Sequence, residues 1–316
     1  MKCLRHCLHN AVTNLRRTNK FPTRLLYLTS NKIIMKTIQR LSVLTFFTLF
    51  FASQTMAQGL KMPQPSSTQT LTQDFGLGKI SLVYSRPNLR GRTVFGGLVP
   101  YGQVWRTGAN GATLLTLSEE IKINGTTVPA GEYGLFTIPG KSEWTVIISK
   151  GSKQWGSYAY KEADDLIRFK VKPTTLKDKV ETFTIQFDKV YENSAVLNLM
   201  WENTAVAINL GTETDSRVMA SIEESMMGEK KPYLQAAQYY YANGKDMTKA
   251  LEWANAAEAA DSKAPWVRYW KARIQLKAGD KKGAAATAEA GIKAAKDMNM
   301  DEYVRLNSAV LAEAKK

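Results

Sequence analysis

Histidine and cysteine are nearly absent from this chain. Its two histidines and two cysteines, among 316 residues, all lie within residues 1–9. Ser–His and Cys–His catalysis, zinc sites built from these ligands, disulfides and thiol redox chemistry all need such side chains. From residue 10 onward the sequence therefore excludes all four, and it predicts neither a metal site nor a cofactor.

Acidic residues are missing from residues 1–57. Within this stretch, residues 35–57 have the pattern of a secretory signal peptide. A basic region (Met35–Arg40) precedes an apolar run (Leu41–Ala52), and small residues lead to a cleavage site after Ala57. The apolar run is too short to span a bilayer comfortably, and no later run is long enough. The sequence therefore predicts an exported protein, periplasmic or extracellular, with no membrane span after cleavage.

Residues 1–34 are interpreted as an upstream extension from a mis-assigned start. The alternative is an organelle transit peptide, which is also Arg-rich and poor in acids. Residues 1–57 hold nine of the 43 basic residues and none of the 28 acidic ones, so residues 58–316 carry a net charge of only +6. Most of the basicity is therefore targeting sequence, and we predict no nucleic-acid partner.

Residues 58–211 contain a predicted leader followed by a β domain. Residues 58–74 are rich in Gln, Pro, Ser and Thr, as in a flexible leader. Over residues 75–211, apolar and polar residues alternate with a period of two, which is typical of half-buried strands. Asn124-Gly125 predicts a hairpin, and Glu202-Asn203 predicts a tight turn. Many antiparallel strands with frequent turns indicate a β-sandwich or jelly roll.

Residues 215–316 are rich in Ala, Lys, Glu and Tyr with helical spacing. Two segments match at an offset of 35 residues, around Gly244 and Gly279. Residues 231–296 therefore resemble tetratricopeptide-like helical hairpins, with further helices predicted over Asp215–Met227 and Asp301–Ala314. The alternative is an ordinary small helical bundle. Such hairpins are expected to contact the sandwich, a protein partner, or both.

The segment Phe75–Ser118 contains no acidic residue but combines arginines with aromatic residues and glycines. Arginine binds carboxylate, sulfate and phosphate, and aromatic faces stack on sugars. One interpretation is a groove for an anionic or saccharide ligand; the other is that the arginines brace irregular loops. The candidate ligand-binding residues are Arg86, Arg90, Arg92, Tyr101, Trp105, Arg106, Asn110 and Glu132.

The stretch Ser85–Asn110 resembles the signature of a bacterial family, domain of unknown function 2911. Tyr133–Pro139 and Trp201–Asn203 fit this family as well, so the resemblance covers about residues 75–210. It implies an exported protein, mostly found in the Bacteroidetes, and no established activity. The resemblance also implies that many members carry an acidic residue where this chain has Gly111, so that a candidate acidic site residue is missing here.

Three functions are compatible with the sequence. The leading hypothesis is a two-domain, non-enzymatic protein whose β domain binds a polar anionic or saccharide ligand. The alternatives are a carboxylate-dependent glycan hydrolase with Glu132 as a candidate, since glycosidases need neither His nor Cys, and a purely structural envelope protein. Trp155, Tyr158 and Tyr160 are interpreted either as a sugar platform or as packing residues.

Overall fold

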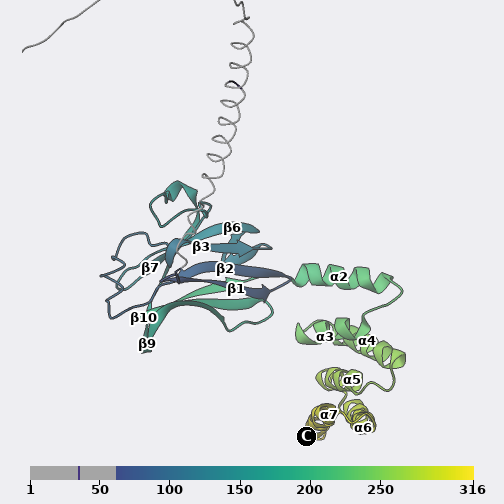
Figure 1. Ribbon diagram of the computed structural model, residues 1–316. Coiled ribbons are helices and arrows are strands. Elements are labelled where there is room, and N and C mark those ends of the chain that lie inside the picture. Colours follow the sequence, from purple (N-terminus) through teal and green to yellow (C-terminus); the bar gives the residue numbers. More distant parts are fainter. Residues whose placement is uncertain (1–34, 36–61) are drawn as a thin grey trace, which may run out of the picture. The chain divides into compact units, whose positions relative to one another are not determined.

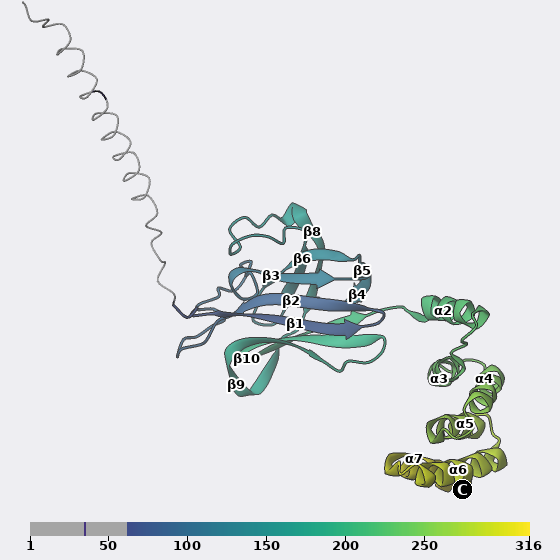
Figure 2. The ribbon, with the colours of Figure 1, turned by 45° about the vertical axis from the view of Figure 1, so that its right-hand side comes forward.

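The computed structural model describes Met35 and residues 62–316 (Figure 1). The predicted extension, the predicted cleavage site and the first residues of the predicted leader lie outside the described residues. Within them, no helix is both long and apolar enough to cross a membrane. Residues Gln64–Lys316 form one compact unit, which contains a β domain followed in sequence by six helices (Figures 1 and 2).

The β domain consists of two antiparallel sheets, as the sequence predicted. The six-stranded sheet has the order β1-β2-β3-β6-β7-β8, and the four-stranded sheet has the order β5-β4-β10-β9. The strands are β1 (Ser67–Phe75), β2 (Gly78–Arg86), β3 (Ala109–Leu117), β4 (Ile121–Ile123), β5 (Thr126–Val128), β6 (Gly131–Ile138), β7 (Trp144–Ser149), β8 (Asp165–Val171), β9 (Thr174–Asp188) and β10 (Ser194–Gly211).

One hydrophobic core lies between the two sheets. Several strands bury alternate residues in it, for example Ile80, Leu82 and Tyr84 of β2. Its largest members are aromatic: Phe95, Trp105, Trp144, Phe183 and Trp201. Their ring centroids lie 4.8–6.4 Å apart, mostly edge to face, and Trp105 and Trp201 are stacked at 5.8 Å. The arginine-rich segment thus enters the core through its aromatic residues.

The Asn124-Gly125 hairpin is confirmed, because β4 and β5 flank it and both residues have positive φ angles of 49° and 85°. The tight turn predicted at Glu202-Asn203 is wrong. β10 runs through both residues, and Glu202 lies at a β-bulge with φ 55°. The Glu202 carboxylate accepts a hydrogen bond from the Val94 amide at 3.2 Å, so the bulge is stabilised by a residue far away in the sequence. Local turn preferences carry no information about such a contact.

The predicted flexible leader extends too far toward the C-terminus. Residues Ser67–Phe75 form the edge strand β1, paired along its whole length with β2. Its exposed Thr residues alternate with partly buried Gln69, Leu71 and Gln73 and lead to buried Phe75. Threonine favours strands, so a polar composition can mark an edge strand with a solvated face as well as a leader.

The loop between β7 and β8 packs on Phe136, which is buried but does not belong to the main core. The loop contains the short 3₁₀ helix η1 (Glu162–Asp164), and Tyr160 packs on Phe136 with ring centroids 5.2 Å apart. The Tyr160 hydroxyl donates a hydrogen bond to Asp165 at 2.6 Å. Burial, then this hydrogen bond, raises the pKa of Tyr160, so the hydroxyl stays a donor at ordinary pH.

Six helices follow β10 and pack as hairpins. They are α2 (Asp215–Met227), α3 (Tyr233–Ala242), α4 (Met247–Ala260), α5 (Pro265–Lys277), α6 (Lys281–Asp297) and α7 (Asp301–Ala314). Gly244 and Gly279 have φ angles of 63° and 89°, and they end α3 and α5. The side chains of Asp246 and Asp280 then cap the N-termini of α4 and α6, because they accept hydrogen bonds from backbone amides in the first turn. The 35-residue match therefore reflects a repeated turn and cap; it does not by itself establish a tetratricopeptide assignment.

Candidate functional site

The structure separates the candidate arginines by what their guanidinium groups contact. Arg86 donates to the Phe183 carbonyl at 3.1 Å and to Thr184 Oγ1 at 2.8 Å, which ties β2 to β9. Arg92 donates to the carbonyls of Leu89 and Asn88 at 2.9 and 2.8 Å within its own loop. These two side chains therefore brace the protein backbone. This matches the second interpretation of the segment, in which arginines stabilise irregular loops.

Arg106 is different, because its side chain has no acceptor among the described residues. Its Nε atom is buried and forms no hydrogen bond, and no carboxylate pairs with the guanidinium. An unpaired buried donor costs about 1–3 kcal/mol unless something else satisfies it. Arg106 lines a cavity of about 310 Å³, so a ligand in that cavity could supply the missing acceptor.

The cavity is lined by both apolar and polar residues. Trp105, Trp201 and Tyr158 contribute aromatic rings to the lining, and Gln103, Ser157 and Arg106 contribute polar groups. The remaining lining residues are Pro87, Leu98, Val99, Pro100, Val104, Gly108 and Ala109. A hollow lined by apolar and aromatic residues together with several polar groups is typical of small-molecule sites. We name this hollow the Arg106 cavity.

Backbone contacts hold Arg106 in place from both sides. Trp105 exchanges two backbone hydrogen bonds with Thr137 of β6, at 2.7 and 2.9 Å. Thr107 is fully buried with φ 53°, a strained conformation for a β-branched residue. Its carbonyl accepts from Thr113 Oγ1 at 2.6 Å, and its hydroxyl lies 3.1 Å from that of Thr137. The fold thus maintains a costly backbone geometry next to the unpaired arginine.

Asn110 contacts the loop that contributes Ser157 and Tyr158 to the cavity. It has φ 59°, its carbonyl accepts the Gly156 amide at 2.9 Å, and its side chain donates to Ser85 Oγ at 3.2 Å. The bond from Gly156 ties Asn110 to the loop that contains Ser157 and Tyr158. Tyr158 is 88% exposed and Trp155 71% exposed, so the packing interpretation is wrong for both, whereas Tyr160 is a packing residue.

The other candidate residues do not line the Arg106 cavity. Arg90 is exposed, and only its backbone amide is engaged, by Glu181. Tyr101 covers Gly96 and lines a separate hollow of about 110 Å³. Glu132 pairs with Lys153 at 2.9 Å. A ligand role for these three residues stays a prediction, but the structure does not bring them together with Arg106.

No metal-binding group appears in the part of the chain that the structure describes. Within residues 62–316, no three His, Cys, Asp or Glu side chains gather closely enough to hold an ion. Asp165 is engaged instead by Tyr160 and by Arg168 at 3.1 Å. Burial raises the pKa of Asp165 despite these two partners, as expected for a carboxylate in a structural network.

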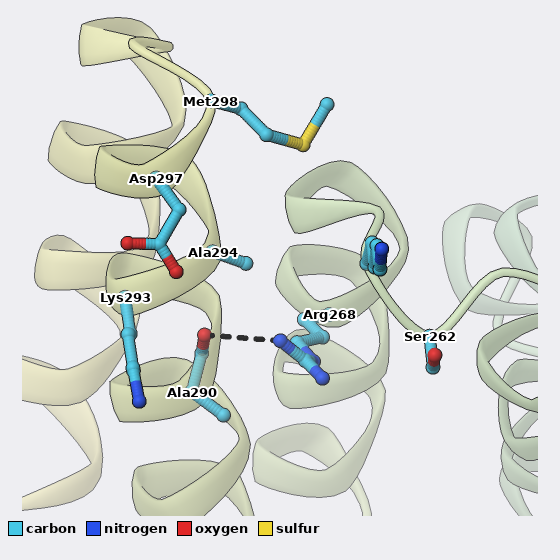
Figure 3. A pocket seen from close by; sticks show the side chains of 8 residues that line it. Ser262, Arg268, Ala290, Lys293, Ala294, Asp297 and Met298 are labelled. Atoms are coloured by element: carbon cyan, nitrogen blue, oxygen red, sulfur yellow. Dashed lines mark hydrogen bonds between the residues drawn. The ribbon is translucent and has the colours of Figure 1, made fainter.

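A larger hollow of about 580 Å³ lies beside α5 and α6 in the helical region (Figure 3). Arg268 reaches into it, but this side chain already bonds the Ala290 carbonyl at 3.2 Å and Glu258 at 3.0 Å. Lys263, Lys293 and Asp297 on its rim are exposed and of mixed sign. It therefore offers no buried group in need of a partner, in contrast to the Arg106 cavity.

Sequence reasoning missed most of the wall of the Arg106 cavity. Gln103, Ser157 and Trp201 come from three distant segments, and only long-range pairing brings them together. Tyr158 was noted as one of three aromatic residues in the β7–β8 loop. The glycine between Trp155 and Tyr158 was the available signal for a turn, and Gly156 does have a positive φ of 69°.

We expect the brace and the exposed arginine to differ in their effect on stability. Replacing Arg86 by Gln removes two hydrogen bonds from a charged donor, so the free energy of unfolding should fall by about 1.5 kcal/mol. The matched change Arg90→Gln should stay within about 0.5 kcal/mol, as for ordinary surface substitutions. Urea denaturation of both variants measures this; equal losses would show that Arg86 is no brace.

Fold and cavity together define a two-sheet antiparallel β domain with an arginine-containing hollow of ligand size. Residues 66–210 match the family model described as "Protein of unknown function (DUF2911)", and the β domain belongs to this family, as its signature indicated. The chain matches no curated protein. It also matches no solved structure.

Proposed function

We propose that this is an exported, non-enzymatic binding protein whose β domain takes a polar anionic or saccharide ligand in the Arg106 cavity. The helical region would serve as a protein-interaction region. The observation that carries the proposal is the Arg106 guanidinium, which lines a cavity and has no protein acceptor among residues 62–316. A carboxylate or sulfate would supply two parallel hydrogen bonds to it.

The exposed aromatic residues favour a saccharide that carries the anionic group. Tyr158 lines the cavity, and Trp155 lies three residues before it in the same loop. Exposed aromatic side chains are costly to leave in water, and their faces suit the apolar face of a sugar ring. Oligosaccharides containing a uronate combine both features, so we use them and inorganic sulfate as probes.

The hydrolase alternative gains no support from the arrangement of carboxylates. Glycosidases need two carboxyl groups about 5–10 Å apart across the scissile bond. Glu132 forms an ion pair with Lys153, and no acidic residue lines the Arg106 cavity. We therefore propose binding without turnover.

Thermal unfolding with and without each probe tests the proposal. A ligand that binds only the folded state raises the melting temperature with its concentration. We expect a uronate-containing oligosaccharide to do so, and Arg106→Gln to weaken its affinity about 10- to 100-fold, the scale of a charge-assisted hydrogen bond. Arg92→Gln is the matched control and should leave the affinity unchanged. No shift with any probe, or equal affinity in the Arg106→Gln variant, would overturn the proposal.

A further inference from the structure

Arg273, on α5 in the helical region, has no carboxylate partner among the described residues and lies against three aromatic rings. The guanidinium carbon of Arg273, on α5, lies 4.7 Å from the ring centroid of Tyr241, 4.8 Å from that of Trp270 and 5.4 Å from that of Tyr269. It donates to the hydroxyls of Tyr269 and Tyr241 at 3.1 and 3.0 Å. Its charge is thus held by neutral groups alone.

The cations of α5 divide into two sets. The helix carries four cations and no acid. Arg268 and Lys271 both pair with Glu258, at 3.0 and 2.7 Å. Over residues 62–316, by contrast, neither Arg273 nor Lys277 has a carboxylate partner; Lys277 lies 4.5 Å from the Tyr241 ring and donates to the Tyr241 carbonyl. One side of α5 is therefore neutralised internally, and the other keeps two positive charges.

The aromatic residues around this pair of charges form a continuous row across three helices. Tyr241 of α3 contacts Trp270, which contacts Tyr269, with ring centroids 5.8 and 5.4 Å apart. Tyr303 of α7 lies 6.4 Å from Tyr269 and 6.2 Å from Trp266. All five rings are partly exposed. We call these rings together with Arg273 and Lys277 the α5 aromatic face.

The ring geometry decides which anion this face can take. Arg273 lies against the rings of Tyr241 and Trp270, and Lys277 lies against that of Tyr241. The rings meet one another at 60–75°. Bases of nucleic acids bind by stacking on open aromatic faces along a track of positive charge. Here the cations themselves cover faces of the rings, which leaves less of those faces for stacking bases. Only two cations of α5, Arg273 and Lys277, lack a carboxylate partner among the described residues, which is too few for a track along a nucleic-acid backbone. A carboxylate therefore fits this face better than a nucleic acid.

We infer that the α5 aromatic face binds an acidic peptide segment of a partner protein. A Glu or Asp carboxylate would accept hydrogen bonds from Arg273 and Lys277, and neighbouring apolar side chains would pack on Trp266, Tyr269 and Tyr303. Charge complementarity indicates the type of partner. Two cations without carboxylate partners on one face attract an acidic segment and disfavour a basic one. This inference rests on the interaction role proposed for the helical region and specifies its surface and its ligand.

Selection from a displayed library of random dodecapeptides on the full chain tests the inference. The selected peptides should be enriched in Asp and Glu, and their affinity should fall as the salt concentration rises. Arg273→Gln should weaken them about 10- to 100-fold and Lys277→Gln several-fold. Lys293→Gln, an exposed cation of α6, is the matched control and should have no effect.

Two further measurements separate a loss of binding from a loss of folding. Arg273→Gln could loosen the contact between α3 and α5, so its melting temperature is compared with wild type, and the exposed Lys277 provides a variant without that risk. Selected peptides without acidic enrichment, peptides that bind Lys277→Gln and Arg273→Gln as well as wild type, or displacement by a single-stranded oligonucleotide would overturn the inference. A library that yields no binder at all would also contradict the interaction role itself, whereas the Arg106 probes report on the β domain alone.

Discussion

Replacing Trp201 by alanine is expected to lower the free energy of unfolding by about 3–5 kcal/mol, the largest effect of any change considered for this protein. The side chain is 1% exposed and lies at the centre of the aromatic core, within 5.7–6.3 Å of the rings of Phe95, Trp105 and Phe183. Its indole nitrogen donates to the Glu181 carbonyl at 3.2 Å. Alanine would leave a cavity and an acceptor without its donor.

Chemical denaturation followed by far-ultraviolet circular dichroism measures this loss. Trp155→Ala is the control, because this indole is 71% exposed, and it should change stability by no more than about 0.5 kcal/mol. Similar losses for the two variants would contradict the placement of the core between the sheets.

Replacing Glu258 by glutamine is expected to cost about 2–3 kcal/mol at neutral pH. The carboxylate of Glu258, on α4, bonds Arg268 and Lys271, and all three side chains are only about one-fifth exposed. Glutamine keeps the shape but leaves two cations half-buried without an opposite charge. The exposed pair of Lys315 and Glu289 provides the control: Glu289→Gln should cost less than about 1 kcal/mol.

The effect of Glu258→Gln should depend on pH. Burial alone would raise the pKa of Glu258, but hydrogen bonds from Lys271 and Arg268 outweigh it and lower the pKa. A lowered pKa in the folded state stabilises the protein above the ordinary pKa, and this stabilisation is lost as the pH falls through the folded value. The difference between wild type and Glu258→Gln should therefore shrink below about pH 4.5; a constant difference would show that the charge does not matter.

The elements of the fold could be predicted largely because their signals are local. Period-two alternation located most strands, Asn124-Gly125 located a hairpin, and the repeated glycine turns located the helical hairpins. The errors arose where contacts between residues far apart in the sequence determine the local conformation. Glu202 lies in a bulge stabilised by the Val94 amide, and the polar strand β1 is ordered by pairing with β2.

The candidate site was harder to predict for the same reason. The sequence identified an arginine-rich segment, but whether an arginine braces or binds depends on partners far away in the chain. Arg86 finds its acceptors 97 and 98 residues further on, while Arg106 finds none among the described residues. Spacing in one sequence cannot distinguish these two outcomes.

The Nε–H resonances of the arginine side chains provide the most direct test of the central claim, that Arg106 receives a ligand. They would be followed by heteronuclear NMR during titration with a uronate-containing oligosaccharide or with sulfate. The account predicts that the Arg106 Nε–H signal moves on binding, because this donor gains an acceptor, while the signals of Arg86 and Arg92 stay in place. An Arg106 signal that does not move with any probe, or that moves no more than those of Arg86 and Arg92, would contradict it.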